Sequence, residues 1–126
     1  MAVQLAHLYV TLCLARIFFH LALILGAPLA QWAPGGGPEG RATRGARALS
    51  ALAALVLLGQ AAAMLVVAGV PGTERAASAA VARWIAVGLP AAGLALGLIS
   101  AAEADRRLWR VLDLVMLALS LAVLSA

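Results

Sequence analysis

Residues 48–70 read ALSALAALVLLGQAAAMLVVAGV and contain no charged side chain. A membrane-spanning helix needs roughly 20 mainly apolar residues to cross a hydrocarbon core of ~30 Å. We therefore predict a transmembrane helix here.

Three more apolar runs repeat this pattern, at about residues 4–27, 79–100 and 108–126. The connections are rich in Gly, Pro and charged residues, as in residues 31–47, the pair Pro71-Gly72 and residues 103–110. Nothing alternates with the period of two that a membrane β-barrel would need. The pattern predicts one all-α integral membrane domain over residues 1–126, a four-helix bundle of two transmembrane hairpins that run up-down-up-down.

Composition excludes the other broad classes. The chain is 65% hydrophobic with a mean hydropathy of +1.05, whereas soluble domains are roughly 45–50% apolar. The net charge of +4 comes from arginines in short connections without interleaved aromatics, so we expect no nucleic-acid partner.

Cys13 is the only cysteine, which excludes an intrachain disulfide. No basic residue precedes Arg16, so the first run is expected to be a retained span and not a cleaved signal peptide.

The arginines predict an orientation. The first and third connections lie on one side of a four-span protein, and cytoplasmic loops are enriched in basic residues. That side carries six arginines, against Arg75 and Arg83 on the other. We expect loops 28–47 and 101–107 to be cytoplasmic and both termini to lie outside a bacterial inner membrane. The six residues that set topology or contact lipid headgroups are Arg41, Arg44, Arg47, Arg106, Arg107 and Arg110.

Small residues on the third run predict close helix packing. Gly93 and Gly97 form a GxxxG pair, and Gly88 keeps the same helix thin. Packing within the chain is favoured over dimerisation for a protein of this size. Pro90 should kink this helix and free the carbonyl of Ala86, because proline has no backbone N–H to donate.

Four side chains on the first run share one helical face: Tyr9, Cys13, Arg16 and His20. An arginine near the middle of a span costs about 2.5–3.5 kcal/mol on insertion scales, so it needs a polar partner. Counting along the spans puts Arg16, Gln60 and the carbonyl freed by Pro90 at one depth. Asp113 lies level with His20, roughly 7 Å from Arg16 along the membrane normal. We predict a polar cluster in the membrane, made of Arg16, His20, Gln60 and Asp113.

Several roles are open for this cluster. A structural one, in which the charge pair sets helix register, is favoured for so small a chain. Alternatively, Arg16 with Gln60 grips an anionic headgroup or substrate, or His20 with Asp113 passes a proton. Asp113 also has Arg110 as a local partner, which would leave Arg16 in need of another.

Catalytic and cofactor signatures are weak throughout. His7 and His20 lie on different faces of one helix, so one chain cannot clamp a metal or haem with both. No GxSxG elbow is present, and Gly35–Gly37 lacks the strand and the Lys-Ser/Thr of a phosphate loop. We expect no cofactor, no metal and no enzymatic activity.

Two stretches carry a resemblance, HLALILGAPLAQWAPGG at residues 20–36 and DRRLWR at residues 105–110. Together they resemble uncharacterised small four-span membrane proteins of high-GC bacteria. Those have a His-bearing first span, a Gly-Ala-Pro end and a basic loop, and a proline two residues after the later Trp, where this chain has Val111. The resemblance covers about a third of the chain; it implies the four-span fold and no activity.

Two functions are the leading hypotheses, ahead of an enzyme that works on a lipid or quinone. The first is a non-enzymatic accessory or structural subunit that binds other membrane proteins or lipids. The alternative is a small transporter or channel that works as a homo-oligomer, with the polar face around Arg16 lining the path.

Overall fold

The computed structural model describes residues 2–33, 40–73, 78–100 and 105–125, and of Asp105 and Arg106 the backbone only. This part of the chain is helical and contains no strand. The four main helices are α1 (Ala2–Ile24), α2 (Arg44–Val67), α3 (Ala79–Ile99) and α4 (Arg110–Ser125). A 3₁₀ turn covers Ala30–Trp32, and a π-helical turn at Asp105–Trp109 leads into α4. Four helices are long and apolar enough to cross a membrane, the last counted from Arg107, which confirms the predicted all-helical membrane bundle.

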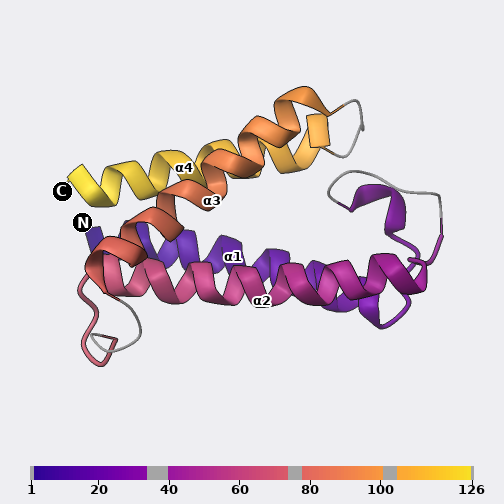
Figure 1. Cartoon of the computed structure of the whole chain (residues 1–126), viewed down its shortest axis with the longest axis horizontal. Helices are drawn as coiled ribbons and strands as arrows, with labels where there is room; N and C mark the ends of the chain where they lie inside the picture. Colours follow the sequence, from indigo (N-terminus) through magenta and orange to yellow (C-terminus); the bar gives the residue numbers. More distant parts are fainter. Residues whose placement is uncertain (1, 34–39, 74–77, 101–104, 126) are drawn as a thin grey trace.

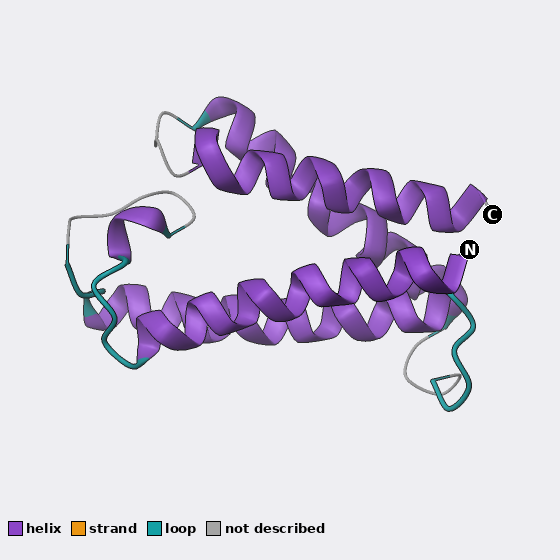
Figure 2. Cartoon of the chain, turned by 180° about the vertical axis from the view of Figure 1, so that it is seen from behind, coloured by secondary structure: helices purple, strands orange, loops and turns teal. Residues whose placement is uncertain are grey.

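Each of the four main helices packs mainly against two others. The hairpins α1–α2 and α3–α4 are joined by contacts of α1 with α4 and of α2 with α3. Figure 1 shows α3 leaving α2 at the end where both chain termini lie, and rising towards α4 at the other end. Figure 2, from behind, shows α1 and α2 side by side along their length. We call the end with both chain termini the terminal end. The opposite end, where Arg41, Arg44, Arg47 and Arg107 lie, is the arginine-rich end (Figure 1).

Glycines end α1 and α2 about three residues earlier than the sequence pattern predicts. Gly26 and Gly69 adopt positive φ values of 100° and 72°. At the end of α1, the N–H of Ala27 reaches back to the Ala22 carbonyl at 2.9 Å, and the end of α2 repeats this bond from Val70 to Leu65 at 3.1 Å. This is the Schellman geometry, which turns the chain before the following proline is reached.

Hydroxyl caps define the starts of α2 and α3. Oγ1 of Thr43 accepts a hydrogen bond from the N–H of Ala46 at 3.2 Å, so α2 begins at Arg44, four residues before the expected position. Oγ of Ser78 accepts from the N–H of Val81 at 3.2 Å, and α3 begins at Ala79 as predicted. Each cap satisfies a backbone donor that the first helical turn leaves unpaired.

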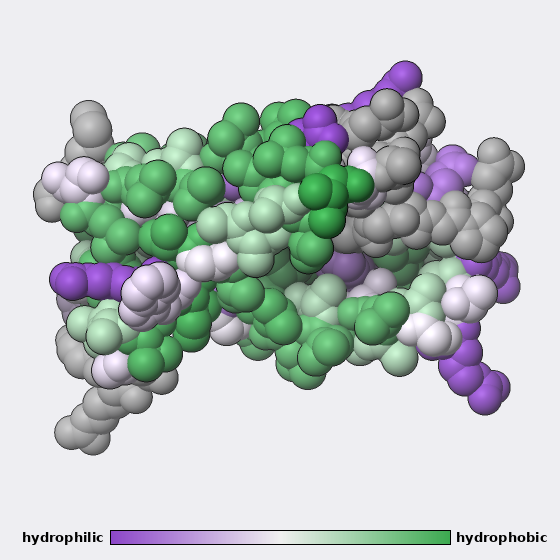
Figure 3. Space-filling view, turned by 45° about the horizontal axis from the view of Figure 1, so that its top comes forward, coloured by the Kyte–Doolittle hydropathy of each residue, from purple (hydrophilic) through white to green (hydrophobic). Residues whose placement is uncertain are grey.

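The bundle is apolar outside as well as inside. Large side chains such as Leu25 (87% exposed) and Ile99 (82% exposed) point away from the helices. Figure 3 shows a mainly hydrophobic surface across the middle of the molecule. Such a surface fits a lipid bilayer, where apolar side chains need not be buried in protein. The main core cluster consists of Ala6, Tyr9, Cys13, Leu57, Ala61, Met64, Ala86, Met116 and Val123.

Two of the three glycines expected to pack do lie against another helix. A Cβ atom on Gly97 would lie 3.6 Å from Cβ of Arg110, and one on Gly93 would collide with Asp113. The GxxxG pair therefore faces α4 of the same chain. A Cβ on Gly88 would meet nothing within 4 Å, so among the described residues Gly88 makes no close helix contact.

Candidate functional site

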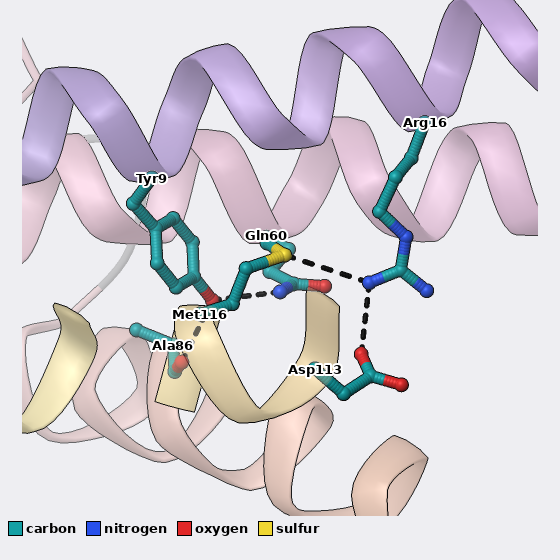
Figure 4. Close-up of polar contacts among 6 residues, drawn as sticks. All are labelled: Tyr9, Arg16, Gln60, Ala86, Asp113 and Met116. Carbon is teal, nitrogen blue, oxygen red and sulfur yellow. Dashed lines mark hydrogen bonds and ion pairs between the residues drawn. The ribbon is translucent and has the colours of Figure 1, made fainter. Parts of the chain in front are cut away.

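The first polar link between the two hairpins runs through Tyr9 (Figure 4). Its hydroxyl donates to the carbonyl oxygen of Ala86 at 2.7 Å and accepts from Nε2 of Gln60 at 2.7 Å. The Ala86 carbonyl has no helical donor because Pro90, four residues later, has no N–H. One hydroxyl thus satisfies the carbonyl freed in α3 and ties it to α1 and α2.

The second link is an ion pair between α1 and α4. Nη1 of Arg16 donates to Oδ1 of Asp113 at 2.8 Å and contacts Sδ of Met116 at 3.5 Å. The side chains are 13% and 7% exposed, so the pair is largely buried. The guanidinium carbon of Arg16 also lies 5.2 Å from the centre of the Trp109 ring, within the range of a cation–π interaction.

Gly93 makes room for the carboxylate of this pair. A Cβ atom at Gly93 would lie 2.6 Å from Oδ2 and 2.8 Å from Cγ of Asp113. Real Cβ atoms do not approach other atoms so closely. The carboxylate of α4 is therefore pressed against the backbone of α3, and the small residue at position 93 is part of the site.

His20 has a different partner from the expected one. Its Nδ1 lies 3.1 Å from Oγ of Ser50 on α2, so the pair forms a hydrogen bond within the first hairpin. The imidazole stacks on Trp109 with ring centres 6.3 Å apart and an interplanar angle of 21°. Both His20 and Trp109 are 3% exposed.

The third link between the hairpins lies at the arginine-rich end. Nε1 of Trp109 donates to the carbonyl oxygen of Trp32 at 2.6 Å. The Trp109 ring thereby closes the bundle over Arg16 and His20. Tryptophans near the ends of spans commonly lie at the membrane surface; Trp84, 79% exposed near the start of α3, suits that position, whereas Trp109 is buried.

A groove opens between α2 and α3 beside these contacts. Its volume is about 310 Å³. All four residues of the predicted polar cluster line it, together with exposed apolar side chains of α2 and α3 that flank its mouth. The lining is Arg16, His20, Leu49, Leu52, Ala53, Val56, Leu57, Gln60, Leu89, Gly93 and Asp113.

The pairings inside the cluster differ from three of the expected ones. Arg16 does not reach the Ala86 carbonyl, because Tyr9 occupies it. Asp113 pairs with Arg16 across the bundle, and Nη2 of Arg110 instead donates to the Gly97 carbonyl at 3.0 Å. His20 bonds to Ser50 of α2, whereas one of the open roles paired it with Asp113 in a proton relay.

Three contributors to the site were not predicted from sequence: the Tyr9 hydroxyl, Ser50 and Trp109. Tyr9 did share the helical face of Arg16, and Ser50 lies on α2 at the depth of His20. These signals mark residues that can reach the cluster but do not identify the partner of each. Trp109 lies at the start of a span, a position at which tryptophan commonly anchors a helix at the membrane surface, so its position alone does not indicate a buried role.

The remaining arginines of the orientation set lie at the arginine-rich end. Arg41, Arg44 and Arg107 are exposed, and Nε of Arg47 donates to the Ala42 carbonyl at 3.1 Å. The side chain of Arg106 lies outside the described residues, as does Arg75. Among the side chains that are described, no three His, Cys, Asp or Glu residues come together as a metal-binding group.

The chain was compared with known families, curated proteins and solved structures. No family model matches it, and no curated protein or solved structure matches it either.

Proposed function

We propose that this is a non-enzymatic membrane protein that binds another membrane component, a lipid or a partner subunit, in the groove between α2 and α3. The observation that carries the proposal is the composition of the groove. Polar groups of Arg16, Gln60 and Asp113 border it at depth, and exposed apolar residues line its mouth. A site with apolar walls and a few convergent polar groups is the usual form of a ligand site.

The pairing of the polar groups supports binding in preference to catalysis. Arg16 is bonded to Asp113, and His20 to Ser50, which fixes these side chains in place. The Ser50 hydroxyl does lie beside a possible general base, His20, but Ser50 is 5% exposed and does not line the groove, so it is not presented to a ligand there. Fixed donors and acceptors in an apolar groove serve recognition and orientation.

We further propose that the arginine-rich end faces the cytoplasm of a bacterial cell, with loops 28–47 and 101–107 inside and both termini outside. Exposed arginines at that end support this orientation. They would also contact the anionic headgroups of the inner leaflet.

Native mass spectrometry of the protein, extracted from its own membrane in detergent, tests the proposal. The expected result is a retained lipid or subunit that is lost in Leu52→Trp, because Leu52 lines the groove and is 58% exposed. Leu114→Trp is the matched control, since Leu114 is 54% exposed on α4 and does not line the groove. Equal retention by both variants would overturn the proposal.

A small transporter is the second candidate, favoured by the charged pair at membrane depth. It predicts a flux of solute or protons into liposomes that Arg16→Leu abolishes while the protein remains folded. Copurification in fixed stoichiometry with a larger complex, with Arg16→Leu merely destabilising the protein, would exclude it in favour of the accessory role.

A further inference from the structure

We propose that the groove takes an uncharged lipid whose polar end is a small ring with carbonyl oxygens, that is, a prenylquinone. The inference rests on the proposed binding function and names its ligand class. It concerns binding alone, with no electron or proton transfer. Unused hydrogen-bond donors, the net charge of the site, and its depth each point to this class.

Two nitrogens of the Arg16 guanidinium, Nη2 and Nε, have no hydrogen-bond acceptor among the described residues. Its Nη1 is engaged by Asp113 and Met116, but Nη2 bonds to none of the described residues, and its buried Nε has no partner either. In Figure 4 the contact with the carboxylate runs from Nη1, and none is drawn from Nη2. A guanidinium donor without an acceptor is costly in an apolar setting. An acceptor atom on a ligand in the groove would remove that cost.

The charge of the site favours an uncharged acceptor. Asp113 lies 2.8 Å from Arg16 and balances its charge, so the pair together is neutral. A phosphate or carboxylate would have to lose its hydration and then compete with Asp113 for the same guanidinium. A carbonyl oxygen accepts a hydrogen bond from Nη2 without either cost.

Depth separates a quinone from the glycerolipids of the bilayer. Arg16 precedes the end of α1 at Ile24 by eight residues, which is about 12 Å along the helix. The ester carbonyls of a glycerolipid stay near the headgroups, whereas a quinone ring is uncharged and can enter the hydrocarbon region. Leu52, Val56 and Leu89 provide apolar walls on which such a ring and its chain would pack.

Trp109 provides a built-in probe for the test. Its ring contacts Arg16 and His20 and is shielded from lipid, with 3% exposure. In the double variant Trp32→Phe, Trp84→Phe it is the only tryptophan, and its bond to the backbone of residue 32 is retained. Decylubiquinone, which quenches tryptophan fluorescence, is titrated into this protein in phosphatidylcholine nanodiscs. The control protein carries Trp32→Phe, Trp109→Phe and keeps Trp84, which is 79% exposed.

We expect saturable quenching of Trp109 and only linear, unsaturated quenching of Trp84. Arg16→Lys retains a charge for Asp113 but lacks Nη2, and we expect it to weaken quinone binding about tenfold or more. Val56→Phe fills the groove and should abolish saturation. Protection of Cys13, 0% exposed in the native protein, from N-ethylmaleimide verifies that each variant is folded.

Three results would overturn the inference: linear quenching of Trp109, saturable quenching that Arg16→Lys leaves unchanged in a folded protein, and displacement of the quinone by dioleoylglycerol or phosphatidylglycerol at equal concentration. In each case the mass-spectrometry test of Leu52→Trp is independent. If that variant still loses a bound component, the groove binds something other than a quinone and the proposed function stands.

Discussion

The hydroxyl of Tyr9 donates to the carbonyl oxygen of Ala86 at 2.7 Å, the carbonyl that Pro90 leaves without a donor. A helix defect in one hairpin is thus repaired by a side chain of the other. In a membrane no water is at hand for this purpose, so the repair has to come from protein. The proline and the tyrosine act together as a coupling between α3 and α1.

Tyr9→Phe should therefore destabilise the bundle by about 1–2 kcal/mol, because it leaves both the Ala86 carbonyl and the Gln60 amide without their partner. Unfolding in a mixed-micelle denaturant titration measures the loss. Thr11→Val is the control, since the Thr11 hydroxyl is exposed and bonds only within its own helix turn. Adding Pro90→Ala, which restores the backbone donor, should make the effect of Tyr9→Phe smaller; strictly additive effects would contradict the coupling.

Replacing one residue of the Arg16–Asp113 pair should lower the free energy of unfolding more than replacing both. Arg16→Met and Asp113→Leu each break the contact between the two charges and leave a buried one behind, Asp113 at 7% or Arg16 at 13% side-chain exposure, and we expect a loss of about 3–5 kcal/mol. The double variant should be more stable than either single one. A double-mutant cycle on unfolding free energies measures this, and a double variant less stable than both singles would contradict it.

Glycines 88 and 93 should respond in opposite ways to the same change. Gly93→Ala places a methyl group 2.6 Å from Oδ2 of Asp113, so the carboxylate has to move and the pair with Arg16 weakens. Gly88→Ala meets nothing within 4 Å and should stabilise α3 by about 0.5–1 kcal/mol through the helix propensity of alanine. Thermal unfolding of the two variants in the same detergent compares them. Equal shifts of Tm would show that Gly93 does not seat the carboxylate.

The thiol of Cys13 should not react with membrane-permeant maleimides until the bundle unfolds. Its side chain is 0% exposed in the core cluster between α1 and its neighbours. In a Ser78→Cys variant, where position 78 is exposed, intact-mass analysis should show a single label on the native protein and two after denaturation. Rapid double labelling of the native protein would mean that the core is open around Cys13.

Much of the architecture was predictable from the chain alone, because each span is long, apolar and bounded by Gly, Pro or Arg. The ends of the helices were less accurate: Gly26 and Gly69 turn the chain before the prolines that seemed to mark the ends. At the site, the depth count brought Arg16 and Asp113 close enough to pair, and they do. The same count could not choose between Arg16 and Tyr9 as the donor to Ala86, since that depends on rotation of each helix about its axis and on side-chain reach.

The partition of charge between the hairpins has a consequence for biogenesis. Arg16 enters the bilayer on the first hairpin and Asp113 on the last helix, so Arg16 lacks this counter-ion until α4 has been inserted. The first hairpin therefore lies in the membrane with Arg16 not yet paired to Asp113 until α4 has been synthesised and has docked. Chains that stall or are cut between the hairpins would present a lone intramembrane charge, a mark by which the insertion and proteolysis machinery of the membrane can tell unfinished molecules from finished ones.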